Sequence, residues 1–115
     1  MKKKIMVINI IGTNYTIYTD VPKDDEKLNN MDGYCMPEKK KIILDANSVP
    51  EHKQHVLAHE LTHAFLYESG LDVETWARNE EIVDWIAIQL FKISSTVKKA
   101  QKKLKEANEN GRKEN

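Results

Sequence analysis

Two histidines four residues apart, His59 and His63, are the residues of this chain best suited to bind a metal ion. They belong to the run HELTH, whose second residue is Glu60. Four residues of an α-helix turn through about 400°, so both imidazoles project from one face and can reach one zinc ion at about 2.0–2.1 Å. Glu60 is rotated by about 100° from His59 and cannot easily bind that ion. It can instead act as general base on a metal-bound water.

A catalytic zinc site needs a third protein ligand from another element, with the fourth position left for water. Glu80, 17 residues after His63, and Asp84 lie four residues apart on a predicted helix and share a face. We expect Glu80 to be the third ligand and Asp84 to accept the second N–H of a ligating histidine. Glu81 is the ligand if this helix is rotated. The alternative to a metal site is a helix with surface histidines, followed by an acidic first turn that the helix dipole favours.

Four further residues around this run allow more than one interpretation. His55 lies one turn before His59, but we expect it to face solvent because the three ligands are already assigned. Tyr34, Tyr67 or a residue that the sequence does not identify could stabilise the tetrahedral oxyanion, and Tyr34 also lies in the candidate substrate-binding strand. The thiolate of Cys35 could occupy the fourth metal position and hold an enzyme latent. A lone cysteine, however, is more often a small buried apolar residue.

Two helices are predicted to position these side chains. The first has Ser48 as N-cap in a capping box with Glu51, Pro50 in its first turn, and Gly70 just past its end. Its core-facing residues are Leu57, Leu61, Ala64 and Phe65. The second begins near the N-cap Asn79 and continues with helical apolar spacing to about Val97. We expect Trp76 and Trp85 to pack in the core.

The segment before these helices predicts a small sheet. Residues 4–10 and 15–19 are β-prone runs that form a hairpin around 11–14, and 33–36 and 41–44 form a second extended pair around 37–40. Residues 20–32 are a polar, irregular link. The predicted fold class is α+β, with a small N-terminal antiparallel or mixed sheet packed on the active-site helix and on a second long helix. Residues 33–36 are the candidate edge for an extended polypeptide substrate.

The composition indicates one domain over residues 1–97 and a basic tail, helical or frayed, over 98–115. The chain has 115 residues and no net charge, but residues 98–115 carry seven basic and three acidic side chains, a local charge of +4. No aromatic residues interleave these charges, which disfavours nucleic-acid binding. No apolar run is long enough to span a membrane. A single cysteine excludes an intrachain disulfide and favours a reducing cytoplasm. The oligomeric state is left open.

The motifs together resemble the gluzincin arrangement of thermolysin-type metallopeptidases. The runs HELTHAFLYESG and WARNEEIVDWIA resemble more closely the small phage-encoded ImmA/IrrE-like zinc metallopeptidases, over roughly residues 5–92. The resemblance implies a zincin-like domain with Zn²⁺ on His59, His63 and Glu80, Glu60 as catalytic base and Asp84 supporting a ligand. Larger relatives cleave repressor proteins, so a phage or host regulatory protein is one candidate substrate. This chain departs from them in lacking an appended sensor or DNA-binding domain, and Asp84 replaces an Asn found in many relatives.

The competing hypothesis is a zinc-stabilised interaction or regulatory module without turnover. Small domains often need a metal ion to fold, and this chain is short. A structural zinc site, however, normally has four protein ligands, and only three are identified in this sequence. The sequence therefore favours a zinc-dependent endopeptidase.

Overall fold

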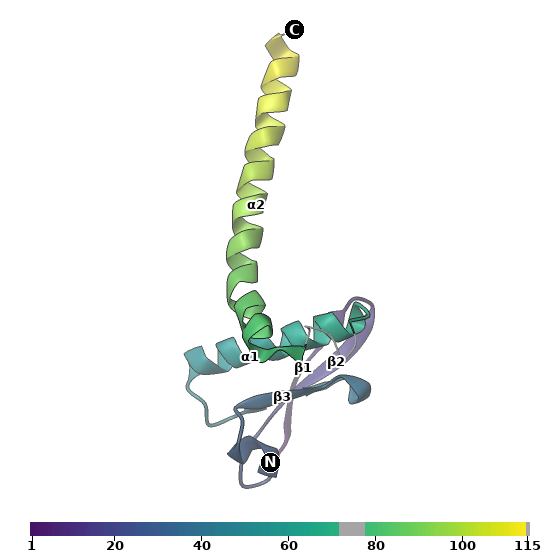
Figure 1. Cartoon of the computed structure of the whole chain (residues 1–115), viewed down its shortest axis with the longest axis vertical. Helices are drawn as coiled ribbons and strands as arrows, with labels where there is room; N and C mark the ends of the chain where they lie inside the picture. Colours follow the sequence, from purple (N-terminus) through teal and green to yellow (C-terminus); the bar gives the residue numbers. More distant parts are fainter. Residues whose placement is uncertain (72–77, 115) are drawn as a thin grey trace.

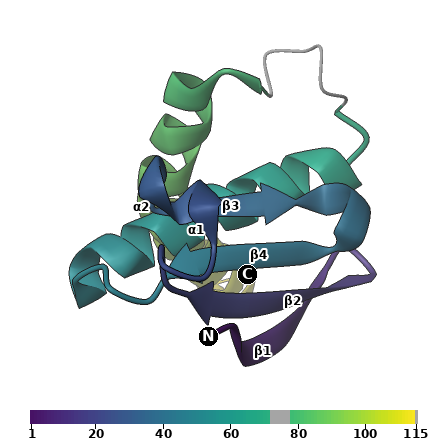
Figure 2. The same ribbon diagram turned by 90° about the horizontal axis from the view of Figure 1, so that it is seen from below.

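The computed structural model describes residues 1–71 and 78–114. A four-stranded mixed sheet is followed by two helices, which confirms the predicted α+β fold (Figure 2). The strands lie in the order β1-β2-β4-β3, with β2 and β4 parallel and the two outer pairs antiparallel. Their bounds are β1 Lys3–Ile10, β2 Thr13–Asp20, β3 Gly33–Met36 and β4 Lys41–Asp45.

Both predicted hairpins are present. The first closes through two residues, Ile11 and Gly12, rather than the four expected, and both have positive φ angles, 48° and 89°. Two positive φ angles give a turn whose twist matches that of the strands. The Gly12 N–H donates to Asn9 Oδ1 at 2.9 Å, which reinforces the turn. The second hairpin turns through a short 3-10 helix, η2 (Pro37–Lys39).

The polar link between β2 and β3 is more regular than the sequence predicted. It contains a 3-10 helix, η1 (Glu26–Asn29), whose N-cap Asp25 accepts a hydrogen bond from the Lys27 N–H. Leu28 of this turn is buried. One apolar side chain in an otherwise polar stretch gives little periodicity to detect, so the turn was missed.

Helix α1 (Pro50–Glu68) packs against β3, β4 and β1. The core between them consists of Ile10, Tyr15, Ile17, Ile42, Leu44 and Ala64. Leu57 and Leu61 pack against this core as predicted, whereas Phe65 is exposed. The predicted Ser48 capping box is wrong: the N-cap is Val49, which makes no side-chain cap. The residue before a proline is forced into extended geometry, so Pro50 places the helix boundary at Val49.

Strand β3 lies unusually close to α1. A Cβ atom added to Gly33 would lie 2.7 Å from Cγ1 of Val56 and 3.0 Å from the carbonyl oxygen of Ile43. No side chain fits in that space without displacing a neighbour. Gly33 therefore allows the outer strand of the sheet to approach the helix that carries His59 and His63.

Helix α2 (Glu80–Glu114) begins against α1 and then projects far from the rest of the molecule (Figure 1). Asn79 caps it as predicted, since its Oδ1 accepts the Ile82 N–H at 3.0 Å. Val83 and Ala87 are buried where the two helices contact. Trp85 is 57% exposed, so its predicted core position is wrong; it lies about 200° around the helix from Val83. Trp76 lies outside the described residues.

The projecting helix makes the molecule elongated. Its extents are 68 × 32 × 26 Å and its radius of gyration is 18.5 Å, against about 13 Å for a compact domain of this length. The basic segment from Lys98 continues α2 as regular helix. Neither described helix combines the length and apolar character required to cross a membrane.

Candidate metal centre

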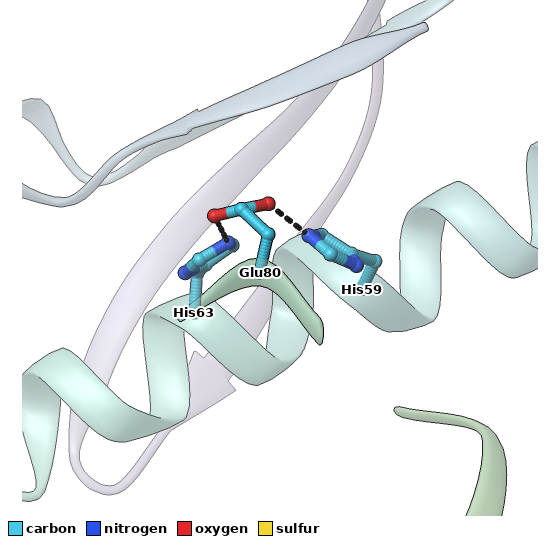
Figure 3. A group of neighbouring side chains, drawn as sticks. All are labelled: His59, His63 and Glu80. Atoms are coloured by element: carbon cyan, nitrogen blue, oxygen red, sulfur yellow. Dashed lines mark hydrogen bonds and ion pairs between the residues drawn. The ribbon is translucent and has the colours of Figure 1, made fainter. Parts of the chain in front are cut away.

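Helices α1 and α2 bring His59, His63 and Glu80 together (Figure 3). One ligand atom from each lies within 4.8 Å of the others. Glu80 Oε2 is 2.8 Å from His59 Nε2, and Glu80 Oε1 is 3.0 Å from His63 Nε2. Two imidazole nitrogens and a carboxylate converging in this way can hold a metal ion.

The helical register positions the two histidines as the sequence predicted. The centroids of the two imidazole rings are 4.9 Å apart, with the rings edge-on to one another. Both rings direct Nε2 at the Glu80 carboxylate. Glu80, the first residue of α2, lies opposite them because Asn79 caps the helix there. Glu80, and not Glu81, makes these contacts, and Glu81 is exposed.

Asp84, one turn further along α2, contacts the candidate ligand His59. Its Oδ1 lies 3.0 Å from His59 Nδ1, so both ring nitrogens of His59 have an acidic partner. If Nδ1 carries the proton that Asp84 accepts, Nε2 presents a lone pair to the Glu80 carboxylate. A nitrogen lone pair and a carboxylate oxygen repel each other. The short distance between His59 Nε2 and Glu80 Oε2 is therefore favourable only when a proton or a metal cation lies between them.

The electrostatics of the two histidines differ. Burial would lower the pKa of His59, but its hydrogen bonds to Asp84 and Glu80 outweigh burial and raise that pKa. Burial lowers the pKa of His63, with Glu80 only partly opposing the effect. A neutral imidazole is the form that binds a metal ion, so burial of His63 favours its role as a ligand.

His55 is exposed, as expected, and it also contacts this network. Its Nε2 lies 2.7 Å from Asp84 Oδ1, the same oxygen that contacts His59. The hydrogen bond to His55 is the largest cause of the lowered pKa of Asp84. The sequence contained a signal for this contact, because His55, His59 and His63 recur every four residues along one helix face.

Glu60 is the most deeply buried charged side chain beside the ligands, with 8% exposure. Burial raises its pKa to about 7, with His59 opposing the shift and Glu80 adding to it. It is not one of the three converging ligands, as its rotation around the helix predicted. A carboxylate with a pKa near neutrality can both accept and return a proton.

A groove runs past this centre between β3 and the helices. A cavity of about 520 Å³ lies on the His63 side, bounded by Tyr34 and Cys35 of β3 and by Tyr67 of α1. A smaller one of about 260 Å³ lies on the His59 side. Glu60 and Glu80 line both cavities, so the candidate ligands lie where the two hollows meet.

Side chains with O–H or N–H groups line the groove and are candidates to stabilise an oxyanion. The Tyr34 hydroxyl donates to the Asp25 carboxylate, and burial, followed by that bond, raises its pKa. Tyr34 lines the larger cavity, but its hydroxyl is engaged by Asp25. Tyr67 lines the same cavity, as does Arg78, which the sequence analysis missed. Arg78 is the one lysine or arginine among the described lining residues, two positions before Glu80.

Cys35 also lines the larger cavity but is not one of the converging ligands. Burial, followed by the charge of Glu60, raises the pKa of its thiol to about 12. The thiol is therefore protonated at neutral pH in this environment.

Comparisons of this chain with protein-family models, with curated proteins and with solved structures gave no match.

Proposed function

We propose that this protein is a zinc-dependent endopeptidase of the gluzincin type, related to the ImmA/IrrE-like group that its motifs resemble. The observation that carries the proposal is the convergence of His59, His63 and Glu80 beside the buried carboxyl group of Glu60. Two imidazoles and one carboxylate form the protein ligand set of many hydrolytic zinc enzymes. Three protein ligands leave the fourth coordination position of the metal free for a water molecule or the substrate.

Zinc is the metal that this donor set favours. Imidazole nitrogen suits zinc better than it suits magnesium or calcium, which prefer oxygen ligands. When bound, zinc supplies Lewis-acid polarisation of water and of the substrate carbonyl. In the proposed site the Nε2 atoms of His59 and His63 and the carboxylate of Glu80 hold the ion.

Glu60 and Asp84 have the remaining roles. The Glu60 carboxylate takes a proton from the attacking water and delivers it to the leaving amine nitrogen. Asp84 accepts the Nδ1–H of His59 and keeps Nε2 directed at the ligand position.

The groove supports a polypeptide as substrate. Strand β3 is the last strand of the sheet, so the outer edge of its backbone can pair with an extended peptide. That edge lies beside the cavities that Glu60 lines. Tyr67 and Arg78 are the proposed donors for the developing oxyanion, because the Tyr34 hydroxyl is engaged by Asp25.

Metal content of purified protein tests the site. We expect about one zinc ion per chain in the wild type. The content should fall sharply in His63→Ala and Glu80→Ala and stay unchanged in Glu81→Ala, an exposed neighbour of the same type. No bound zinc even after zinc is supplied would reject the proposal.

A peptide-library digest then tests the chemistry. We expect Glu60→Gln to keep its zinc and lose cleavage, because the amide binds no proton at neutral pH. Cleavage by Glu60→Gln at the wild-type rate would reject the proposed mechanism.

A non-catalytic zinc-stabilised module is the second candidate, because the ligands come from two helices. A metal ion held by His59, His63 and Glu80 would fasten α1 to α2 and stabilise the fold. This candidate predicts zinc-dependent folding and no cleavage by the wild type under any condition. The peptide digest of the zinc-loaded wild type therefore separates the two functions.

A further inference from the structure

An apolar seam runs along almost the whole of helix α2. Starting at Val83, apolar residues recur in strictly alternating steps of three and four. The members are Val83, Ile86, Leu90, Ile93, Val97, Ala100, Leu104 and Ala107. This is the heptad spacing with which one helix packs on another along a coiled coil. The natural partner of such a seam is another helix.

Among residues 1–71 and 78–114, only the start of this seam packs against another element. Val83 is fully buried near α1, whereas Leu90 is 53% and Leu104 is 64% exposed. Figure 1 shows α2 beyond its first turns projecting away from the sheet and α1. Ile93 and Val97, which lie between Leu90 and Leu104 on the seam, are also exposed. The distal half of α2 therefore lacks the packing that its pattern predicts.

We propose that α2 pairs with α2 of a second copy of this chain through this seam. The charges beside the seam favour a copy of itself as partner. The positions that flank it are Gln89, Ser94, Thr96 and Gln101, with Lys103 as the one charged side chain. Like charges at flanking positions would oppose self-association, and this seam has almost none. Five other lysines of α2 lie outside the seam and its flanking positions: Lys92, Lys98, Lys99, Lys102 and Lys105.

Residue sizes along the seam favour an antiparallel arrangement. When the segments 90–107 of two copies overlap in opposite directions, Leu90 faces Ala107, Ile93 faces Leu104 and Val97 faces Ala100. In a parallel pair Ala100 would face Ala100, which leaves a gap in the core of the interface. The antiparallel pairing instead places each alanine opposite a larger side chain, Leu90 or Val97. The overlap of 18 residues is about 27 Å long.

Charge along the helix favours the same orientation. The basic side chains of α2 are concentrated from Lys98 onward. A parallel pair would place both basic ends side by side, where they repel. An antiparallel pair separates them and places residues 100–107 of each copy beside residues 90–97 of the other, where Lys92 is the one charged side chain.

A second apolar patch on α2 does not form part of this interface. Trp85, Ile88 and Phe91 are exposed on the opposite side of the helix. Ser95 and Lys98 follow them at the same spacing, so the patch ends after two turns. It is too short to specify a paired helix.

Sedimentation equilibrium of the full chain tests the pairing. We expect a dimer in the wild type, a monomer in Val97→Glu, and a dimer in Ser95→Glu, which places the same charge on the outer face two residues away. Both positions are exposed, and circular dichroism checks that each variant stays folded. A wild type that remains monomeric at every concentration would overturn the proposal and leave the seam to a different helix. A dimeric Val97→Glu would also overturn it.

Disulfide trapping in a Cys35→Ser background tests the orientation. In the antiparallel pair Leu104 faces Ile93 of the other copy, so Ile93→Cys/Leu104→Cys should cross-link rapidly and Leu104→Cys alone should not. Rapid cross-linking of Leu104→Cys alone would overturn the antiparallel arrangement in favour of a parallel one. Neither experiment depends on zinc or on peptide cleavage, so the pairing and the proposed function can fail separately.

Discussion

Replacing Asp84 with Asn should weaken zinc binding without removing a ligand. Asp84 Oδ1 lies 3.0 Å from His59 Nδ1 and 2.7 Å from His55 Nε2. Asn retains the shape and one acceptor oxygen but loses the negative charge that makes His59 Nε2 a stronger ligand. Changes to such supporting carboxylates typically reduce metal affinity by about 10- to 100-fold.

The size of the effect on stability follows from binding linkage. At free zinc of about 100 times the wild-type dissociation constant, zinc binding should stabilise the fold by about 2.7 kcal/mol. At the same zinc concentration, tenfold weaker binding leaves about 1.4 kcal/mol and hundredfold weaker binding about 0.4 kcal/mol. For a domain of this length, the zinc-dependent rise in Tm should fall from about 11 °C to about 2–6 °C.

The assay is thermal and urea unfolding of each variant in buffered zinc and in chelator. The difference between the two conditions within one variant removes any effect of the substitution on the metal-free fold. The matched control is Glu81→Gln, which removes the same charge from the same turn of α2 at an exposed position. An undiminished zinc increment in Asp84→Asn would refute the supporting role of Asp84. An equal loss in Glu81→Gln would show that only net charge matters.

Three further predictions concern the fold around the site. Ile11→Asn should raise the unfolding free energy by about 1 kcal/mol in urea titrations, because Asn adopts the left-handed backbone at φ 48° more readily than Ile. A loss of stability in this variant would contradict the idea that the backbone at Ile11 is strained. Gly33→Ala should lower that free energy by about 1–3 kcal/mol, because its Cβ meets Val56 at 2.7 Å; an unchanged urea midpoint would contradict the close packing. Hydrogen bonds from Lys40 and then Tyr15 hold the pKa of Glu68 below 4.5, so its stabilisation should be present above that pH and be lost as the pH falls through its folded pKa. Unfolding between pH 6 and pH 3 should show this loss in the wild type and less of it in Glu68→Gln; equal slopes would refute the assignment.

The features predictable from the sequence were those set within a few residues of chain. His59 and His63 share a helix face because of their spacing alone, and a capped helix beginning at Asn79 places Glu80 and Asp84 one turn apart. The hairpins followed from β-prone runs around short polar turns. None of these conclusions required knowledge of which elements pack together.

The features that could not be predicted from the sequence depend on contacts between segments that are distant along the chain. The parallel pairing of β2 with β4 leaves β3 at the sheet edge, and no local pattern specifies that order. Trp85 was assigned to the core from its hydrophobicity, but α1 contacts the side of α2 that carries Val83 and Ala87. The contact between His55 and Asp84 likewise required the relative position of the two helices.

The charge balance of the site would favour the binding of a cation. Glu60, Glu80 and Asp84 surround His59 and His63, so at neutral pH with uncharged imidazoles the group carries up to three negative charges in a partly buried space. Holding these charges close together in a partly buried space is unfavourable. The raised pKa of Glu60 reflects part of that electrostatic cost, because burial and the nearby Glu80 both disfavour its ionised form. A divalent cation between the Nε2 atoms and Glu80 would remove most of the repulsion and lower the pKa of Glu60. The same acids would make a poor salt-bridge network for stability alone. Within the described part of the chain, the one positive group that lowers the pKa of Glu60 is His59, which must lose its proton to bind a metal ion. The arrangement is therefore better explained as a metal-binding site than as an incidental cluster on two packed helices.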